Sequence, residues 1–263
     1  MKYFMKLIFQ TFLIFFLKNI CFADEKPYAQ KDLKSGSYFA TKETRNIEKD
    51  DFENPGMIWV ERGEELFKFS EGPNNISCAT CHNSSNLSLD NVATKYPRID
   101  KTVGHLINLE QKINLCRKNQ MDLKSLEFES RPLLSLSTYI SYLSRGKPMN
   151  VSIDGEANKY FLRGKQLYFK RIGQMNLACN QCHDELSGSY LRSEKISQGH
   201  INGFPSYLMR WDSVASAHKR FQFCNNQARA QPLDIGHIDY NALQLYIAWR
   251  GNSLLIESPS VRR

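Results

Sequence analysis

The chain has 263 residues, of which 41% are hydrophobic and 24% charged, and its formal net charge is +8. These values are ordinary for a globular protein with one large or two modest domains. Three of the lysines lie in the first 23 residues, so the chain without that segment carries +5. A charge of this size gives little reason to expect a nucleic-acid-binding protein, whereas a local positive patch for an anionic substrate fits it better.

Residues 1–23 have the pattern of a secretory signal peptide. Two lysines precede an apolar run at 7–17, and small residues approach a cleavage site before Asp24. The run is too short to remain as a membrane span, and the residues before Cys21 are a poor match for a lipoprotein anchor. No later stretch is apolar enough to cross a bilayer. We therefore expect export to the periplasm and no membrane anchor.

Two Cys-x-x-Cys-His runs dominate the chemistry of the sequence. In such a run two thiols reach the vinyl groups of one porphyrin, and the adjacent imidazole becomes the proximal iron ligand. Zinc sites also use Cys-x-x-Cys pairs, but an immediate histidine in both runs favours haem. The sequence therefore predicts two covalently bound c-type haems, attached at Cys78, Cys81, Cys179 and Cys182 and ligated by His82 and His183.

The text around the two runs repeats. An Arg-Gly pair, a Leu-aromatic pair and the haem motif recur at an offset of 101 residues. Apolar residues at helical spacing predict a helix before each motif, at 57–67 and 160–168. Two further helices are predicted at 131–143, with a proline in the first turn, and at 240–249, capped by Asp239 and ended by Gly251.

These features predict a mostly α fold of two tandem class I cytochrome c-like domains related by internal duplication. The predicted domains span 51–150 and 151–263, with the boundary in a stretch interrupted by proline, asparagine and glycine. Residues 24–50 are polar and are expected to form an extended N-terminal arm. The second domain is expected to be the catalytic one.

One spare cysteine stands in each repeat where a cytochrome c supplies its sixth iron ligand, Cys116 in the first and Cys224 in the second. This placement favours imidazole–thiolate ligation, which would hold the iron at low potential. Other interpretations remain open. The two thiols could form one disulfide in an oxidising compartment, and the rival ligands are Met121, Met209, His105, His200 and His237.

The interval between the second haem motif and Cys224 carries two further features. Residues 197–205 are rich in turn formers and predict a loop that brings backbone close to the porphyrin. If 218–224 is helical, Arg220 and Cys224 lie on one face, one turn apart. Arg220 could then hold an oxyanion beside the sulfur, or it could pair with a haem propionate.

On these residues the chain resembles the diheme A subunits of the sulfur-oxidation AX cytochromes (SoxA), which are L-cysteine S-thiosulfotransferases. The resemblance covers most of the chain after residue 23. It is most specific at 197–205, 210–211, 219–221, 224–225 and 246–251, with matches in the first half at 113–117 and 144–146. The first haem motif is present here, as in the two-haem branch of that family.

The resemblance implies a role for each spare group. Cys116 would ligate the first haem and Cys224 the second, Cys224 could carry an extra sulfur as a persulfide, and Arg220 would bind thiosulfate. Cys224 would join the substrate sulfur oxidatively to a cysteine of a SoxYZ-like carrier protein. Two electrons would leave through haem to a SoxX-like monohaem cytochrome c subunit in a heterodimer.

Two other functions are compatible with the haem motifs alone. A non-catalytic diheme electron carrier needs only the two haems and would use methionine ligands. A diheme peroxidase would need one iron with an open sixth position. The spare cysteines and the spacing of Arg220 and Cys224 favour the transferase over both.

Overall fold

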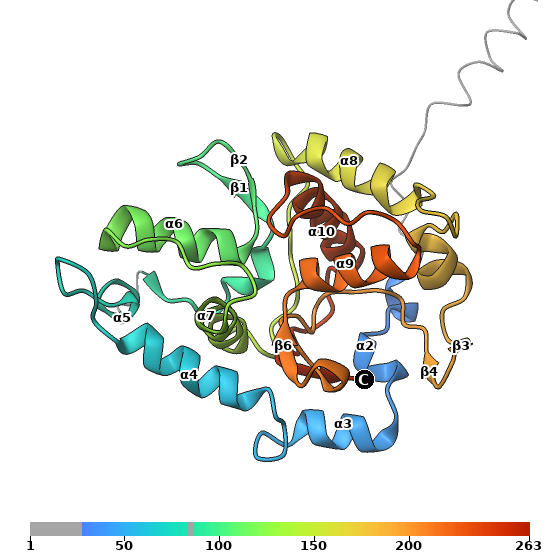
Figure 1. The fold of residues 1–263 in the computed structure, drawn as a ribbon, viewed down its shortest axis with the longest axis horizontal. Coiled ribbons are helices and arrows are strands. Elements are labelled where there is room, and N and C mark those ends of the chain that lie inside the picture. Colours follow the sequence, from blue (N-terminus) through green and yellow to red (C-terminus); the bar gives the residue numbers. More distant parts are fainter. Residues whose placement is uncertain (1–27, 84–86) are drawn as a thin grey trace, which may run out of the picture.

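The computed structural model describes residues 28–83 and 87–263 (Figure 1). Within these ranges the protein is mostly helical, and its short strands pair into three small sheets. The predicted signal peptide lies outside the described residues. In the described ranges, none of the helices has both the length and the apolar character needed to span a bilayer.

The first half of the chain builds a helical unit that carries one hairpin. Its elements are α4 (Met57–Lys68), α5 (Cys78–His82), η3 (Ala93–Lys95), β1 (Arg98–Asp100), β2 (His105–Ile107), α6 (Leu109–Met121) and α7 (Arg131–Tyr142). The predicted helices before the haem motif and at 131–143 are confirmed, and a proline stands in the first turn of α7. Phe67, Leu133 and Leu136 form the centre of its core.

The second half repeats this order and adds strands. Its elements are α8 (Ala157–Phe169), η4 (Gln181–Glu185), β3 (Tyr190–Leu191), β4 (Glu194–Lys195), β5 (Ser206–Leu208), η5 (Met209–Trp211), β6 (Ser213–Ala215), α9 (Ala217–Gln227), α10 (Ile238–Arg250) and β7 (Ser260–Arg262). The central sheet has the order β6-β5-β7, with β5 antiparallel to β6 and parallel to β7. Phe161, Tyr168 and Leu245 are fully buried in its core.

In each half the first helix crosses the last one through a glycine. A Cβ on Gly63 of α4 would stand 2.1 Å from the carbonyl oxygen of Ser135 on α7, and one on Gly164 of α8 would stand 2.0 Å from that of Ala242 on α10. No larger residue fits at either crossing without moving a helix. The Arg-Gly pairs of the sequence are therefore explained by close helix packing.

Other local features also recur between the halves. The loop that leads into each haem motif closes with one antiparallel bridge, Glu71 with Ile76 and Ile172 with Leu177. In both loops an asparagine three residues before the first cysteine has a positive φ, 49° at Asn75 and at Asn176. The same geometry thus appears at the same offset in both halves, while descent of the halves from one ancestral domain stays a prediction.

The prediction of an extended N-terminal arm is wrong. Residues 28–50 contain η1 (Gln30–Asp32), α2 (Gly36–Phe39) and α3 (Lys42–Lys49). The hydroxyl of Thr41 accepts from the backbone N–H of Thr44 and caps α3. The polar composition that suggested an arm instead serves specific contacts with residues more than 150 positions away.

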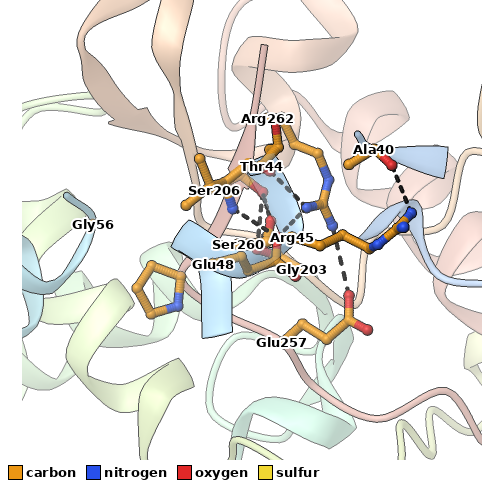
Figure 2. Close-up of polar contacts among 12 residues, drawn as sticks. Ala40, Thr44, Arg45, Glu48, Gly56, Gly203, Ser206, Glu257, Ser260 and Arg262 are labelled. Carbon is orange, nitrogen blue, oxygen red and sulfur yellow. Dashed lines mark hydrogen bonds and ion pairs between the residues drawn. The ribbon is translucent and has the colours of Figure 1, made fainter. Parts of the chain in front are cut away.

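These contacts tie the N-terminal segment to the C-terminal strand (Figure 2). Glu48 is buried at 4% exposure and accepts from the backbone N–H of Val261 at 2.8 Å and from the guanidinium of Arg262. Beside it, the hydroxyls of Ser206 and Ser260 lie 2.7 Å apart, and each is within hydrogen-bond distance of the carbonyl oxygen of Gly203. These hydrogen bonds fix the end of loop 197–205.

One predicted helix cap is also wrong. Helix α10 is capped by His237, whose Nδ1 accepts from the backbone N–H of Asp239 at 3.1 Å, and Asp239 is already inside the first turn. The Asp239 carboxylate instead forms a two-pronged pair with Arg163 of α8, at 2.9 and 2.6 Å. The predicted end at Gly251 is confirmed.

Candidate functional site

The second haem motif lies in a short helical turn that follows the loop after α8. Cys182 and His183 belong to η4, and the side chain of Gln181 accepts from the backbone N–H of Ala178 at 2.8 Å, which caps the turn. Cys179 is packed against the core of the second half. A helical turn places the two thiols and the imidazole of a Cys-x-x-Cys-His run on one side, as attachment of a single porphyrin requires.

His183 is held in the orientation and protonation state of an iron ligand. Its Nδ1 lies 2.8 Å from the carbonyl oxygen of Ser197, and because a carbonyl can only accept, Nδ1 carries the proton and Nε2 keeps its lone pair. Burial lowers the pKa of His183 to about 4, so the ring is neutral at physiological pH.

Loop 197–205 presses backbone against this ring. Gly199 has φ +74°, and a Cβ there would stand 2.7 Å from Cγ of His183. The predicted close approach of this loop is therefore found, and it is made to the imidazole. The loop is in turn anchored by Gln198, whose side chain accepts from the backbone N–H of Lys34 and donates to the carbonyl of Asp32.

The first haem motif has the same arrangement with different caps. Cys78, Cys81 and His82 belong to α5, which begins with a reciprocal capping box between Ser77 and Thr80. Nδ1 of His82 lies 2.9 Å from the carbonyl oxygen of Leu87, so its Nε2 is also left for a metal.

Both motifs therefore fit a covalently bound c-type haem. The donor set is two thiols and one imidazole, with the imidazole tautomer fixed by a backbone carbonyl in each case. The residues that would hold the haems are those predicted: Cys78, Cys81 and His82 in the first half, and Cys179, Cys182 and His183 in the second.

The structure brings Cys224 next to the second motif. It lies on α9, so the condition that 218–224 is helical is met and Arg220 and Cys224 lie one turn apart on one helix. Burial raises the pKa of Cys179 to about 12 and also raises the pKa of Cys182, and in both cases the nearby Cys224 thiol adds to the rise. The side chain of Cys224 is the exposed member of the pair of spare cysteines, and that of Cys116 is partly buried.

Cys116 has the equivalent place beside the first motif, on α6. Burial raises the pKa of the Cys116 thiol; Lys112 opposes this rise, whereas Asp100 and Cys81 add to it. Both Cys116 and Cys224 are free thiols, so the alternative of a Cys116–Cys224 disulfide is not found. Each spare cysteine instead faces the haem motif of its own half.

Arg220 lies one helical turn before Cys224 with an unused donor. Its Nη1 is buried and has no hydrogen-bond partner among the described residues, and its guanidinium stands over the ring of Phe223 at 5.0 Å. Phe223 is backed by Trp211 of η5, ring to ring at 5.5 Å. The positive charge of Arg220 contributes, after burial and the charge of Arg250, to the lowered pKa of His183. A buried donor on the helix that carries the thiol, one turn before it, is suited to an oxyanion.

The rival ligands have contacts of their own. His237 caps α10 through Nδ1, Nδ1 of His105 lies 3.2 Å from the carbonyl oxygen of Leu106, and His200 is buried with Nε2 3.2 Å from the side-chain oxygen of Gln198. Met209 packs against a cluster formed by Trp59, Leu134, Tyr207, Val214 and Val261, and Met121 is the buried last residue of α6. The closeness of Cys116 to Cys81, and of Cys224 to Cys179 and Cys182, is what favours the two cysteines over these residues as sixth ligands.

A buried polar network that no sequence motif indicates lies behind His183. Arg250 is fully buried at the end of α10 and pairs with the carboxylate of Asp184, which also accepts from the hydroxyl of Tyr168 at 2.9 Å. The backbone carbonyl of His183 accepts from Tyr28 at 2.7 Å. A comparison of the two repeats could have indicated the network. The positions of Tyr168, Asp184 and Arg250 hold phenylalanine, asparagine and leucine in the first repeat, at 67, 83 and 143.

The family comparison identifies a cytochrome domain in the first half. Residues 62–149 match the family model described as SoxA/TsdA, cytochrome c domain. The match includes the second half of α4, the first haem motif and all of α6 and α7.

Relatives that match over most of the chain are subunits of one enzyme. The L-cysteine S-thiosulfotransferase subunit SoxA of Pseudaminobacter salicylatoxidans is 38% identical over 87% of this chain and 80% of its own length. The subunit of the same name from Paracoccus pantotrophus is 38% identical over 87% of this chain and 78% of its own. The crystal structure of SoxXA from P. pantotrophus superposes with a TM-score of 0.83 at 37% identity, over 88% of this chain and 87% of that one.

Identity at this level, sustained across both halves and accompanied by the same fold, establishes descent from a common protein. The chain belongs to the SoxA family of cytochromes c.

Proposed function

We propose that this protein is an L-cysteine S-thiosulfotransferase subunit that joins thiosulfate oxidatively to a cysteine of a carrier protein. The observation that carries the proposal is the pair on α9: an exposed thiol, Cys224, one turn from a guanidinium with an unpaired buried donor, Arg220, both beside a haem motif. The names of the relatives at 36–38% identity support the same activity.

The reaction forms one sulfur–sulfur bond and releases two electrons. The Cys224 thiolate forms a bond to the outer sulfur of thiosulfate. This step is a two-electron oxidation, and both electrons leave the two sulfur atoms. A thiolate of the carrier protein then attacks that outer sulfur, takes the S–SO₃⁻ group and returns Cys224 as a thiolate. One proton leaves for each carrier thiol consumed.

The chain's own residues bind and orient these partners. Arg220 would hold the sulfonate oxygens with its planar donors, and Phe223 would keep the guanidinium in place by stacking. When bound, each haem supplies an iron centre that accepts one electron at a time.

The cofactor and partner assignments are part of the proposal. Two c-type haems per chain are supported by two motifs with matching histidine tautomers. Cys116 and Cys224 would be the sixth ligands. The electrons would pass to a monohaem cytochrome c subunit, which the SoxXA structure supports as a partner, and the leader at 1–23 would direct the protein to the periplasm.

The haem count has a direct test. The intact mass of the exported protein should exceed that of the processed polypeptide by two haem groups. An increase by one haem would contradict attachment at both motifs.

The catalytic assignment is tested with a matched pair of variants, Cys224→Ser and Cys116→Ser. Attachment depends on the motif thiols, so both variants should keep both haems. Cys224→Ser should lose thiosulfate-dependent reduction of cytochrome c in the presence of carrier protein. Cys116→Ser should change the spectrum of the first haem and raise its reduction potential while the spectrum of the second haem stays unchanged. Turnover by Cys224→Ser at the wild-type rate would rule out its role as nucleophile.

A further inference from the structure

The hairpin and helix that carry the spare cysteine occur twice in the molecule with the same register. In the first half β1 and β2 lead to α6, and in the second β5 and β6 lead to α9. The last residue of the first strand pairs with the first residue of the second strand in both hairpins, Asp100 with His105 and Leu208 with Ser213. Each helix begins after a capping residue that lies eight positions beyond the end of the first strand: Asn108 after Asp100, and Ser216 after Leu208.

This register makes three pairs of positions equivalent. Counted from the cap, the fourth residue of each helix is basic and the eighth is the spare cysteine. The equivalent residues are Asp100 and Leu208, Lys112 and Arg220, and Cys116 and Cys224. The first half therefore has a cation one turn before its cysteine, as the second half does.

In the first half this cation is occupied by an internal acid. Nζ of Lys112 donates to Oδ2 of Asp100 at 2.8 Å, and the carboxylate side chain is only 4% exposed. The other oxygen, Oδ1, accepts from the backbone N–H of Thr102 at 2.9 Å, which fixes the carboxylate in place. The ammonium group is thus neutralised by a partner that is already buried and oriented.

A second acid closes the same pocket. Arg117, which follows Cys116, is buried and pairs with Glu71. The positions equivalent to Glu71 and Arg117 in the second half are Ile172 and Asn225. Both cations next to the first spare cysteine are therefore paired within the chain.

In the second half neither acid is present. Leu208, at the position of Asp100, is buried at 1% exposure. Within the described ranges, Nη1 of Arg220 is buried without a hydrogen-bond partner. The two halves present the same geometry around the cysteine, but only the second leaves its cation available to a ligand.

We propose that Asp100 closes the first haem pocket to anions, so that this pocket is a blocked copy of the substrate site and only the second half accepts thiosulfate. The inference rests on the proposed role of Arg220 in binding thiosulfate. Asp100 is a specificity residue under this proposal: it occupies the ammonium that a sulfur oxyanion would otherwise use, and it adds a negative charge that repels a dianion.

The first test is Asp100→Asn in the ferric holoprotein. Asparagine keeps an oxygen for the Thr102 N–H but leaves Lys112 without a counter-charge. Thiosulfate is titrated without carrier protein, and binding is followed by calorimetry and by the spectrum of the first haem. The variant should gain one thiosulfate site per chain. Its first-haem spectrum should change at thiosulfate concentrations at least tenfold lower than any that change this spectrum in the wild type. The double variant Asp100→Asn/Lys112→Met should lose both.

An unchanged number of sites and an unchanged first-haem spectrum in Asp100→Asn would overturn the proposal. The result also separates this inference from the function on which it rests. If the wild type binds no thiosulfate while Asp100→Asn binds one, the role of Asp100 stands and the role of Arg220 fails.

The reciprocal variant tests the second pocket. Leu208→Asp places an acid opposite Arg220 and should raise the KM for thiosulfate at least tenfold with little change in kcat. Leu208→Asn introduces a side chain of nearly the same size and polarity as aspartate but without its charge, so it controls for disruption of the core. Equal KM values for the two variants would contradict the proposal. If the aspartate variant loses haem, the Asp100→Asn result decides alone.

Discussion

His183 donates its Nδ1 proton to the carbonyl oxygen of Ser197 across 2.8 Å. The residue two positions further, Gly199, lies against the same ring with a positive φ. One loop therefore sets both the tautomer and the rotation of the imidazole.

We expect Gly199→Ala to disturb the second haem. The added Cβ would stand 2.7 Å from Cγ of His183, at a φ of +74° that alanine adopts at a cost. Backbone strain and overpacking together should lower stability by about 3 kcal/mol. Electron paramagnetic resonance of the ferric protein should show an altered second-haem signal. Gly104→Ala is the control, because Gly104 has φ +69° and open space around it. Identical spectra for the two variants would mean that the loop does not orient the ring.

The exchange Arg220→Lys keeps the charge but removes the planar pair of donors. Losing one charge-assisted contact to a dianion should cost about 2 kcal/mol, which is roughly a thirtyfold fall in kcat/KM for thiosulfate. Haem spectra should stay unchanged. Lys219→Arg, on the exposed side of the same helix, should keep wild-type kinetics. Normal kinetics for Arg220→Lys would favour the alternative in which Arg220 pairs with a haem propionate.

Alanine at the helix crossing should destabilise the second half. A Cβ at position 164 would meet the carbonyl oxygen of Ala242 at 2.0 Å, so α8 and α10 must separate. Gly164→Ala should lower the free energy of unfolding by about 3 kcal/mol, measured by thermal or denaturant unfolding. Leu162→Ala on the same helix removes a side chain that is 52% exposed and should cost below about 1 kcal/mol. Similar losses in the two variants would show that the helices can part easily.

Glu110 should give the protein a pH-dependent stability. Burial raises the pKa of its carboxyl to about 7, with the nearby Glu129 adding to the rise. The folded state therefore keeps a proton that the unfolded state releases above its own lower pKa. Stability should fall as the pH rises from about 4.5 to about 7, by up to about 3 kcal/mol. Glu110→Gln should reduce this fall, and Glu65→Gln, which is exposed, should not. Equal pH profiles for the two variants would contradict the assignment.

The parts of the fold that the sequence predicts correctly depend on local chemistry. The helices at 131–143 and 240–249 follow from apolar periodicity, a proline in one first turn and a terminal glycine. The two Cys-x-x-Cys-His runs form helical turns with matching histidine tautomers, and haem attachment at their six residues stays a prediction. In each case the residues that decide the structure lie within about a turn of one another, so the pattern is complete in the local sequence.

The errors concern contacts between distant segments. Residues 28–50 look like a polar arm because nothing local indicates that Glu48 will meet Arg262. Asp239 has the chemistry of a helix cap, but a two-pronged pair with Arg163 holds it in the first turn instead. The pairing of Lys112 with Asp100 depends on a hairpin that only the folded chain brings against α6.

The contact between Glu48 and Arg262 also bears on how the chain can be divided. The second haem unit is discontinuous in sequence, since it needs the N-terminal segment as well as residues after 150, and the first unit sits inside it as an insertion. A fragment cut at residue 151 would leave buried partners on β7 and in loop 197–205 unmatched. A circular permutant that begins near 151 and joins residue 263 to the N-terminal segment would instead make each unit continuous while keeping the contacts between that segment and β7.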